Sequence, residues 1–412
     1  MLQTINEYFI SIREFNRNFK LYLITIFLIN VGFGVFQTEF NLYILSMGIK
    51  PEFLGVILSL TPFAQALASI PIGFLAEKIG NKHALIMINV VIGFAYLLRV
   101  VSSNQILILA GAFLTGVMAC GYYIVQMPFI SSYVSEDKNK AFTFTSIVFY
   151  SGLSIGTLIG GFLPKLIGHY LADEMLTYRL ILILFSIIII AASSPLFLLE
   201  KDKPHDTRKI SLSPYLNNID KNTIRFAIIE FFIGLGLTFL MLFINIIFIR
   251  YYLSNLEFFG ASTSLLIFPT ILLLFIGPIL AKKSSTLKVM MVTRLLSALF
   301  ALVTVLTINP WLGASAYIIF RSSLILAQSL GVAFAVSVAT RRSRVATSAW
   351  LEATFDIGAG LAALLGGVLI AANGFFALGL ISSVSLGISF YLTWLFFGKN
   401  ESKILTNAEI SS

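Results

Sequence analysis

The stretch from Gly55 to Leu98 reads GVILSLTPFAQALASIPIGFLAEKIGNKHALIMINVVIGFAYLL, and it decides the fold. Two long apolar runs flank a short polar segment, GFLAEKIGNK, at residues 73–82. Each run approaches the roughly 20 residues that a helix needs to span a bilayer. The polar segment is long enough only for a tight reversal, which Gly80 permits. The stretch therefore predicts two successive transmembrane helices.

The rest of the chain has the same character. Of 412 residues, 58% are hydrophobic and 11% are charged, whereas a soluble chain is nearer half apolar and a quarter charged. We expect an all-α membrane protein whose twelve helices form two pseudo-symmetric six-helix bundles. The helices are predicted near 20–47, 52–76, 84–102, 105–133, 142–168, 177–199, 223–253, 258–281, 287–308, 311–339, 345–371 and 375–397.

The basic residues indicate the orientation. Most of the 28 Lys and Arg residues lie on one predicted side, many of them in short loops, and Arg294 of the ninth predicted helix is counted on that side. The exceptions are Lys50, Arg99, Lys165, Arg179, Arg250 and Arg321. By the positive-inside rule both termini are expected in the cytoplasm of a multi-pass cell-membrane protein. The predicted domains are residues 1–199, a cytoplasmic linker at 200–222, and residues 223–412 with a short cytoplasmic tail.

The two halves resemble each other. One displacement along the chain aligns Asn41 with Asn245 and Phe129 with Phe334. A similar displacement aligns Gly152, Gly160 and Gly161 with Gly358, Gly366 and Gly367. These matches indicate an internal parallel repeat.

At this point the chain resembles the major facilitator superfamily, in particular its bacterial drug and solute efflux members. The family motif Gly-x-x-x-Asp-Arg/Lys-x-Gly-Arg/Lys-Arg/Lys is matched by Gly73, Glu77, Lys78, Gly80 and Lys82. Glutamate replaces the aspartate, and Asn81 replaces one basic residue. The second half keeps Gly277, Lys282 and Lys283 but has Ala281 where the acid would stand.

The resemblance implies a gate. In the family the motif's acid docks against the N-terminus of helix eleven, where the helix dipole favours an anion, and closes the cytoplasmic side. Gly73 is expected to let helices approach closely. The alternative is that Lys78 and Lys82 only set the topology.

A second glycine motif lies in the fifth predicted helix. Gly152, Gly156, Gly160 and Gly161 are similar to the glycine motif of drug:proton antiporters, although Thr157 replaces its proline. The alternative is that these glycines, with Gly358, Gly366 and Gly367 of helix eleven, serve helix packing.

Ionisable residues inside spans are costly in lipid and mark functional sites or pairs. Glu39 lies in helix one, and Arg321 and Asp356 lie at similar depth in helices ten and eleven. We expect these three to form the proton- or substrate-coupling site, with Arg321 and Asp356 as an ion pair. The alternative for the pair is purely structural. A structural role is favoured for Glu230 and Glu352.

Other polar residues are candidates to line a substrate cavity. They are Asn30, Gln37, Gln65, Tyr122, Tyr123, Gln126, Asn245 and Gln328. Arg99 ends a helix and is expected to snorkel toward the interface.

Several motifs are absent from the sequence. It holds no P-loop, no metal-ligand cluster and no constellation suited to an intramembrane enzyme, so we expect no cofactor, metal, nucleic acid or enzymatic activity. The predicted function is secondary transport by a monomer that exports a small, amphipathic organic solute in exchange for protons. Uptake of a nutrient by symport and a non-transporting membrane sensor are the alternatives.

Overall fold

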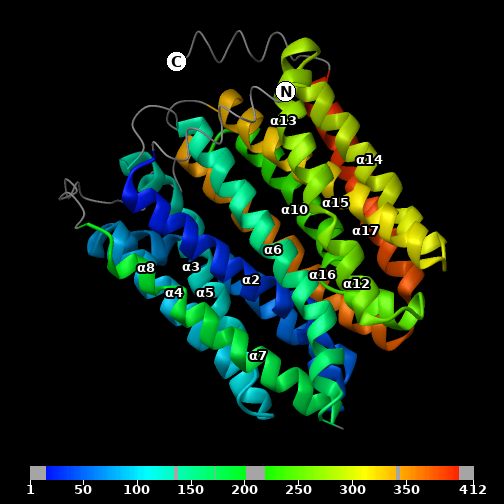
Figure 1. Ribbon diagram of the computed structural model, residues 1–412. Helices are drawn as coiled ribbons and strands as arrows, with labels where there is room; N and C mark the ends of the chain where they lie inside the picture. The colour runs from blue at the N-terminus through cyan, green and yellow to red at the C-terminus, as the bar shows by residue number, and fades with distance from the viewer. Residues whose placement is uncertain (1–14, 134–137, 172, 201–218, 340–343, 399–412) are drawn as a thin grey trace. The chain divides into compact units, whose positions relative to one another are not determined.

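A computed structural model describes residues 15–133, 138–171, 173–200, 219–339 and 344–398 of the chain (Figure 1). Within these ranges the chain is helical and has no strand. Twelve helical segments of this described part are long and apolar enough to cross a membrane. The predicted all-α membrane fold is confirmed.

The helices of the first half follow the predicted spans closely, except that the sixth is interrupted between Ala191 and Ser194. They are α2 (Arg17–Ser46), α3 (Pro51–Ile79), α4 (Asn81–Leu98), α5 (Gln105–Tyr133), α6 (Lys138–Gly168), α7 (Glu174–Ala191) and the short α8 (Ser194–Phe197).

The second half contains breaks that the hydropathy pattern did not predict. Its helices are α10 (Lys221–Met241), α11 (Ile244–Ile246), η1 (Ile247–Tyr251), α12 (Leu256–Ser264), α13 (Ile267–Lys283), α14 (Thr286–Leu306), α15 (Pro310–Val338), α16 (Arg344–Ala371), α17 (Phe375–Thr393) and η2 (Trp394–Gly398). The seventh predicted helix is thus divided after Met241, and the eighth after Ser264. The length of an apolar run predicts that a span is present, but it does not predict where the helix within that span is interrupted.

Short polar side chains begin several of the helices. The side chain of Asp173 accepts a hydrogen bond from the backbone N–H of Leu176 at 3.1 Å, and that of Asp220 accepts one from Thr223 at 2.7 Å. These contacts satisfy N–H groups that have no partner within the helix. The loops can therefore be short.

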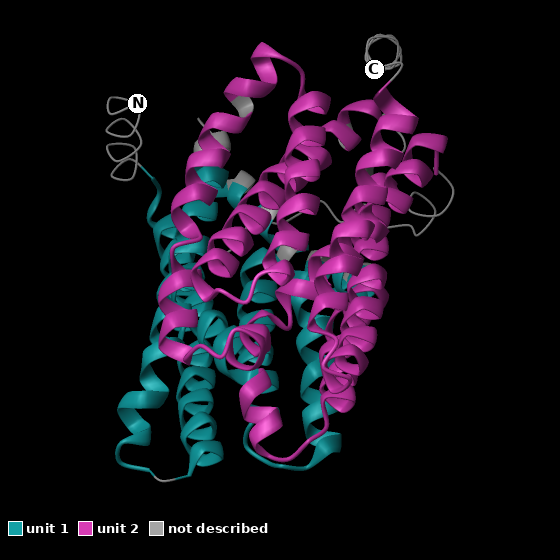
Figure 2. Ribbon diagram, turned by 90° about the vertical axis from the view of Figure 1, so that its right-hand side faces the viewer, with its two compact units in different colours: residues 1–40, 68–208 teal, residues 41–67, 209–412 magenta. Residues whose placement is uncertain are grey.

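The described helices belong to two compact units (Figure 2). One contains residues 1–40 and 68–208, and the other contains residues 41–67 and 209–412. The end of α2 and the first part of α3 thus group with the second half of the chain. The predicted linker falls largely on residues 201–218, outside the described residues, and the predicted domain bounds remain a prediction.

Glycines bring helix backbones together in the same way in both halves. A methyl group at Gly152 of α6 would lie 2.6 Å from the carbonyl oxygen of Phe27 in α2. A methyl at Gly358 of α16 would overlap the carbonyl of Phe231 in α10. Gly156 likewise packs on the backbone of α2, at Val31. The same kind of glycine contact therefore joins α6 to α2 in the first half and α16 to α10 in the second half, as expected for an internal repeat.

Candidate functional site

Glu39 is completely buried in α2, with an exposed fraction of 0%. Among the described residues neither of its carboxylate oxygens has a hydrogen-bond partner. Two helical turns earlier, on the same face of α2, lies Gly32, where a methyl would meet the side chain of Ile189 in α7. Glu39 therefore lies on the face of α2 that packs within the first unit.

The polar neighbours of Glu39 in sequence lie on another face. Asn30, Gln37 and Asn41 recur at helical spacing and share one face of α2. At 3.6 residues per turn that face is opposite Glu39. The sequence grouping of Glu39 with Gln37 and Asn41 is therefore not a grouping in space.

Arg99, at the end of α4, does not snorkel as predicted. Its side chain is buried, and its guanidinium carbon lies 4.0 Å from the ring centroid of Phe40 and 5.4 Å from that of Tyr96. Cation–π attraction to two rings replaces the hydration that the prediction assumed.

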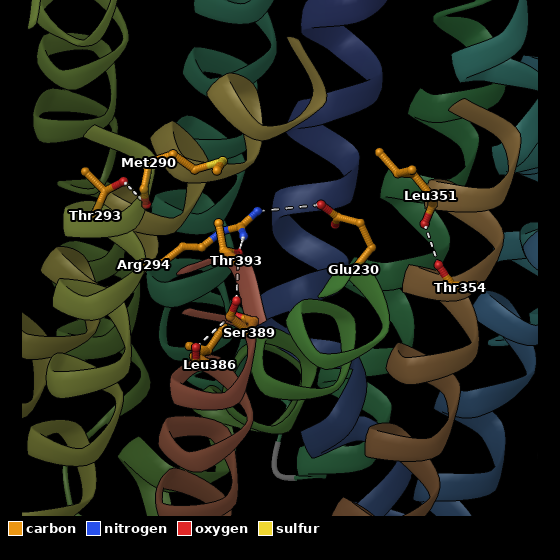
Figure 3. Close-up of polar contacts among 9 residues, drawn as sticks. All are labelled: Glu230, Met290, Thr293, Arg294, Leu351, Thr354, Leu386, Ser389 and Thr393. Atoms are coloured by element: carbon orange, nitrogen blue, oxygen red, sulfur yellow. Dashed lines mark hydrogen bonds and ion pairs between the residues drawn. The ribbon is translucent and has the colours of Figure 1, made fainter. Parts of the chain in front are cut away.

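The second unit contains a buried ion pair between Glu230 of α10 and Arg294 of α14 (Figure 3). Nη2 of Arg294 lies 3.8 Å from Oε1 of Glu230. Nη1 of Arg294 donates a hydrogen bond of 2.5 Å to Oγ1 of Thr393, which in turn donates to the carbonyl of Ser389 at 2.7 Å. One guanidinium thus connects α10, α14 and α17.

The sequence predicts Arg294 within the ninth helix and on its cytoplasmic side, but it does not predict how deeply the side chain is buried. Its side chain is fully buried, because α14 begins at Thr286 and carries Arg294 two turns into the span. Gly331 of α15 leaves room for it, since a methyl there would lie 3.1 Å from Nη2. Glu230 supplies the compensating charge.

Three phenylalanines form a layer beside this pair. The ring of Phe226, one turn before Glu230 in α10, stacks on that of Phe397 with centroids 4.4 Å apart. Phe334 of α15 meets both rings edge-on, at 5.9 and 5.8 Å. All three are buried. The layer thus places apolar surface about one helical turn from Glu230.

The predicted ion pair between Arg321 and Asp356 is not formed. Among the described residues, the charged neighbour that interacts with Asp356 is Glu352, one turn earlier in α16. Arg321 interacts instead with Tyr317, one turn earlier in α15. Arg321 and Asp356 lie at similar depth on consecutive helices, but their side chains do not meet, because Asp356 is on the face of α16 that packs against α3.

Asp356 lies on the face of α16 that meets α3. It is 8% exposed, and Gly360 and Gly367 follow on the same face. A methyl at Gly360 would meet the ring of Phe63, and one at Gly367 would lie 2.6 Å from the Cα of Gly55. Glu352 is exposed and interacts electrostatically with both Asp356 and Glu230.

Asn41 and Asn245, aligned by the repeat, are hydrogen-bonded to each other. Nδ2 of Asn41 donates to Oδ1 of Asn245 at 2.9 Å and to the carbonyl of Leu242 at 2.5 Å. Both asparagines are buried, at the point where α10 is broken. The repeat matched these residues, but it did not predict their contact.

The remaining cavity candidates are distributed over both units. Asn30 is buried and donates to the carbonyl of Ile26 in its own helix at 2.8 Å. Partly buried side chains are found at Gln37, Gln65, Tyr122, Gln126 and Gln328. The side chain of Tyr123 lies outside the described residues. Their role in a cavity stays a prediction.

The motif between α3 and α4 makes one prediction for each of its glycines. The predicted reversal at Gly80 is found, whereas the predicted close approach of helices at Gly73 is not. Gly80 has a φ of +84°, a conformation that favours glycine and allows the reversal. A methyl at Gly73 would meet only Ile124 at an ordinary 4.0 Å. The close approach of α3 and α5 is at Gly121 instead, where a methyl group would lie 2.6 Å from the side chain of Ile72.

The charged residues of this motif are described only in part. Lys82 donates to the carbonyl oxygens of Phe197 and Leu199 beyond α7, and Lys78 is exposed. Lys82 therefore has a structural contact besides any effect on topology. The side chain of Glu77 lies outside the described residues, so its docking stays a prediction.

The other predicted glycines are in tight places. Gly160 faces Thr38 and Val35 of α2, and a methyl at Gly366 would overlap the ring of Phe243. Gly161 is buried. No three His, Cys, Asp or Glu side chains gather as metal ligands in the described part of the chain.

Comparison with known proteins relates this arrangement to one family. Residues 21–215 match the sequence model of the Major Facilitator Superfamily. Two MFS-type transporters of Mycobacterium tuberculosis, from strains CDC 1551 / Oshkosh and ATCC 25618 / H37Rv, are each 28% identical over 152 residues. The match covers 36% of this chain and 36% of each relative, so the chain spans about a third of the length of the curated relatives that it matches.

Solved transporter structures share the fold along nearly the whole chain. The nucleoside transporter NupG has a TM-score of 0.74 at 15% identity, covering 93% of this chain and 98% of its own. A bacterial homologue of the human lysosomal transporter Spinster has a TM-score of 0.71 at 15% identity, covering 95% and 98%. The Escherichia coli fucose:proton symporter FucP has a TM-score of 0.61 at 16% identity, covering 92% and 98%. At these identities the likeness shows the fold alone.

Proposed function

We propose that the chain is a member of the Major Facilitator Superfamily and a proton-coupled exporter of a small, amphipathic organic solute, because residues 21–215 match the sequence model of that family and solved transporters share the fold. It works by alternating access between two bundles. It is a monomer in the cell membrane, with both termini in the cytoplasm, and it needs no cofactor.

The observation that carries proton coupling is the burial of Glu39. An ionised carboxylate with no partner is costly inside a span. Glu39 is therefore suited to hold a proton in this conformation and to release it when its surroundings open to water. A group that binds a proton in one conformation and not in another links the proton gradient to the conformational change.

Asp356 and Arg321 complete the proposed coupling site. Asp356 is buried beside the exposed Glu352, which offers a route by which a proton reaches it. Arg321 is only partly buried and is available to a solute or to Asp356 in another conformation. The site is thus proposed to be assembled during the transport cycle.

The nature of the solute is inferred from composition. Aromatic residues make up 14% of the chain, and polar candidates within the spans are few. Such surroundings favour an amphipathic organic compound. The glycine contacts of α6 with α2 are compatible with the antiporter-like motif, which favours export.

Uptake by symport is the second candidate. One structure that shares the fold is a fucose:proton symporter, and another is a nucleoside transporter. A reversed pH gradient across proteoliposomes separates the two directions. Accumulation inside vesicles that are acidic within supports exchange of solute for protons, and accumulation with the opposite gradient supports symport.

The decisive experiment compares two assays on one variant. Wild-type protein in proteoliposomes is first screened by counterflow with a compound library to obtain a solute. Glu39→Gln should then lose accumulation driven by the pH gradient and keep counterflow, because exchange of solute needs no net proton movement. Glu52→Gln, at an exposed position in the first turn of α3, is the matched control. Wild-type pH dependence in Glu39→Gln would exclude this residue from coupling.

Topology is tested separately by labelling. In a Cys120→Ala background, a cysteine at position 205, outside the described residues, should react with an impermeant reagent only in inverted vesicles. Reaction in intact cells would overturn the orientation.

A further inference from the structure

A missing helical hydrogen bond marks the break in α10. In a continuous helix the N–H of Ile246 would donate to the carbonyl of Leu242. Here that N–H donates to Oδ1 of the neighbouring Asn245 side chain at 2.9 Å. The carbonyl of Leu242 accepts instead from Nδ2 of Asn41 at 2.5 Å. The carbonyl of Leu242 and the N–H of Ile246, which would pair with each other in a continuous helix, thus each have a carboxamide as their partner.

The two carboxamides complete one network. Nδ2 of Asn41 also donates to Oδ1 of Asn245 at 2.9 Å, so Oδ1 accepts two hydrogen bonds. Asn41 is 5% exposed and Asn245 is 1% exposed. Buried backbone groups inside a membrane protein must be paired, and here the pairing depends on a residue of α2.

Close backbone packing surrounds this network. A methyl at Gly55 of α3 would lie 2.8 Å from the carbonyl of Ala363 and 2.9 Å from the Cα of Gly367, both in α16. Gly366 accommodates the ring of Phe243, the residue at the break itself. Residues 41–67 thus fit closely against α10 and α16.

Alternating access requires this fit to be released. Residues 41–67 are continuous with the first half of the chain, whereas α10 and α16 belong to the second half. If the halves separate on the side where α2 ends, Asn41 leaves the carbonyl of Leu242. An unpaired carbonyl and an unpaired N–H would then face each other within one turn of α10.

We propose that Asn41 and Asn245 form a hydrogen-bond exchange switch. When Asn41 withdraws, the carbonyl of Leu242 takes back the N–H of Ile246, and α10 becomes continuous through residues 242–246. The carboxamide of Asn245 is released and binds the solute. This inference rests on the alternating access of the proposed function.

The exchange is balanced, because the Leu242 carbonyl and the Ile246 N–H are paired in both states. The released carboxamide both donates and accepts hydrogen bonds. It therefore fits a solute with a group that does the same, such as a hydroxyl or an amide. In the broken form Asn41 occupies the place that this solute group would take.

The first test measures opening on the side where α2 ends. Spin labels are placed at the exposed positions Lys50 and Leu312 in a Cys120→Ala background, and their distance distribution is measured without any gradient. Asn41→Asp and Asn41→Leu both remove the donor to Leu242 and should raise the long-distance population several-fold. Ser46→Ala is the control, because the Ser46 hydroxyl donates to the carbonyl of Tyr43 within its own helix. A wild-type distribution in both Asn41 variants would overturn the switch.

The second test measures the bond that re-forms. Asn245→Leu alone should speed hydrogen exchange at the Ile246 amide, because Asn41 still holds the Leu242 carbonyl. Asn41→Leu/Asn245→Leu should restore protection, because the helical bond can close. Asn245→Ala repeats the comparison if the leucine variant does not fold. A double variant that exchanges as fast as its Asn245 parent would exclude the exchange.

The two proposals fail in different ways. Neither distances nor amide exchange depends on proton coupling or on export. If the distances and the amide exchange change as expected but transport does not respond to pH, the proposed proton coupling is refuted and the switch is not. If transport is driven by a pH gradient but the distances and the amide exchange are unaltered in these variants, the switch is refuted and the coupling is not.

Discussion

Glu39 in the first unit and Glu230 in the second are both glutamates buried inside spans, but their surroundings are opposite. Glu39 has no partner for either oxygen among the described residues. Glu230 faces Arg294, which is itself held by Thr393. A compensated charge can remain charged throughout the cycle, whereas an uncompensated one must be neutral or find a partner. Burial alone therefore does not identify a coupling residue.

Glu230→Gln should have the largest effect on stability. The guanidinium of Arg294 cannot be deprotonated in a protein, so the variant leaves a permanent buried charge without its counter-ion. Removing one partner of a buried pair costs about 3–5 kcal/mol. The free energy of unfolding in detergent or lipid should fall by that amount, as measured by denaturant titration.

The double variant Glu230→Gln/Arg294→Met is the control for this effect. It removes both charges and should recover most of the lost free energy. If the single variant is as stable as wild type, Glu230 and Arg294 are not coupled in the folded protein, and the contrast with Glu39 disappears.

Glu39→Leu should change stability with the opposite sign. The substitution removes a buried carboxyl group that has no partner, a penalty of about 1–3 kcal/mol. The variant is therefore expected to unfold at higher denaturant concentration than wild type while losing pH-driven transport. A loss of stability similar to that of Glu230→Gln would mean that Glu39 has a partner in the folded protein.

The sequence predicted the membrane spans and the buried acidic residues, but it did not predict which charged side chains form ion pairs. Hydropathy located all twelve helices, and the cost of charge in lipid pointed to Glu39 and Asp356. The burial of Arg294 was not predicted, because the positive-inside rule indicates only on which side of the membrane a basic residue lies. Its burial depends on Glu230, which is distant in sequence. The pairing of Arg321 with Asp356 failed because depth does not determine which face of a helix meets which neighbour.

The glycines allow the two halves to be compared at matched positions. Gly152→Ala and Gly358→Ala each place a methyl against the backbone of the paired helix, at Phe27 and at Phe231. Overpacking of this kind costs about 1–3 kcal/mol. Gly73→Ala is the control, since its methyl would meet Ile124 at ordinary contact distance. Thermal unfolding should show losses for the first two variants and none for the third.

The smallest expected effect concerns Glu77, which has no counterpart at Ala281. If its carboxylate docks at a helix N-terminus, Glu77→Gln loses about 0.3–1 kcal/mol of stabilisation of the closed cytoplasmic side. That free energy corresponds to a change of about two- to fivefold in the ratio of open to closed molecules.

Spin labels at the exposed positions Phe197 and Ser284 should report the shift as a larger long-distance population. Ala281→Gln introduces the same amide at the position without an acid and should leave the distribution unchanged. If Glu77→Gln also leaves it unchanged and transport is normal, the motif acts through Gly80, Lys82 and topology rather than as a latch, and the asymmetry between the halves has no role in gating.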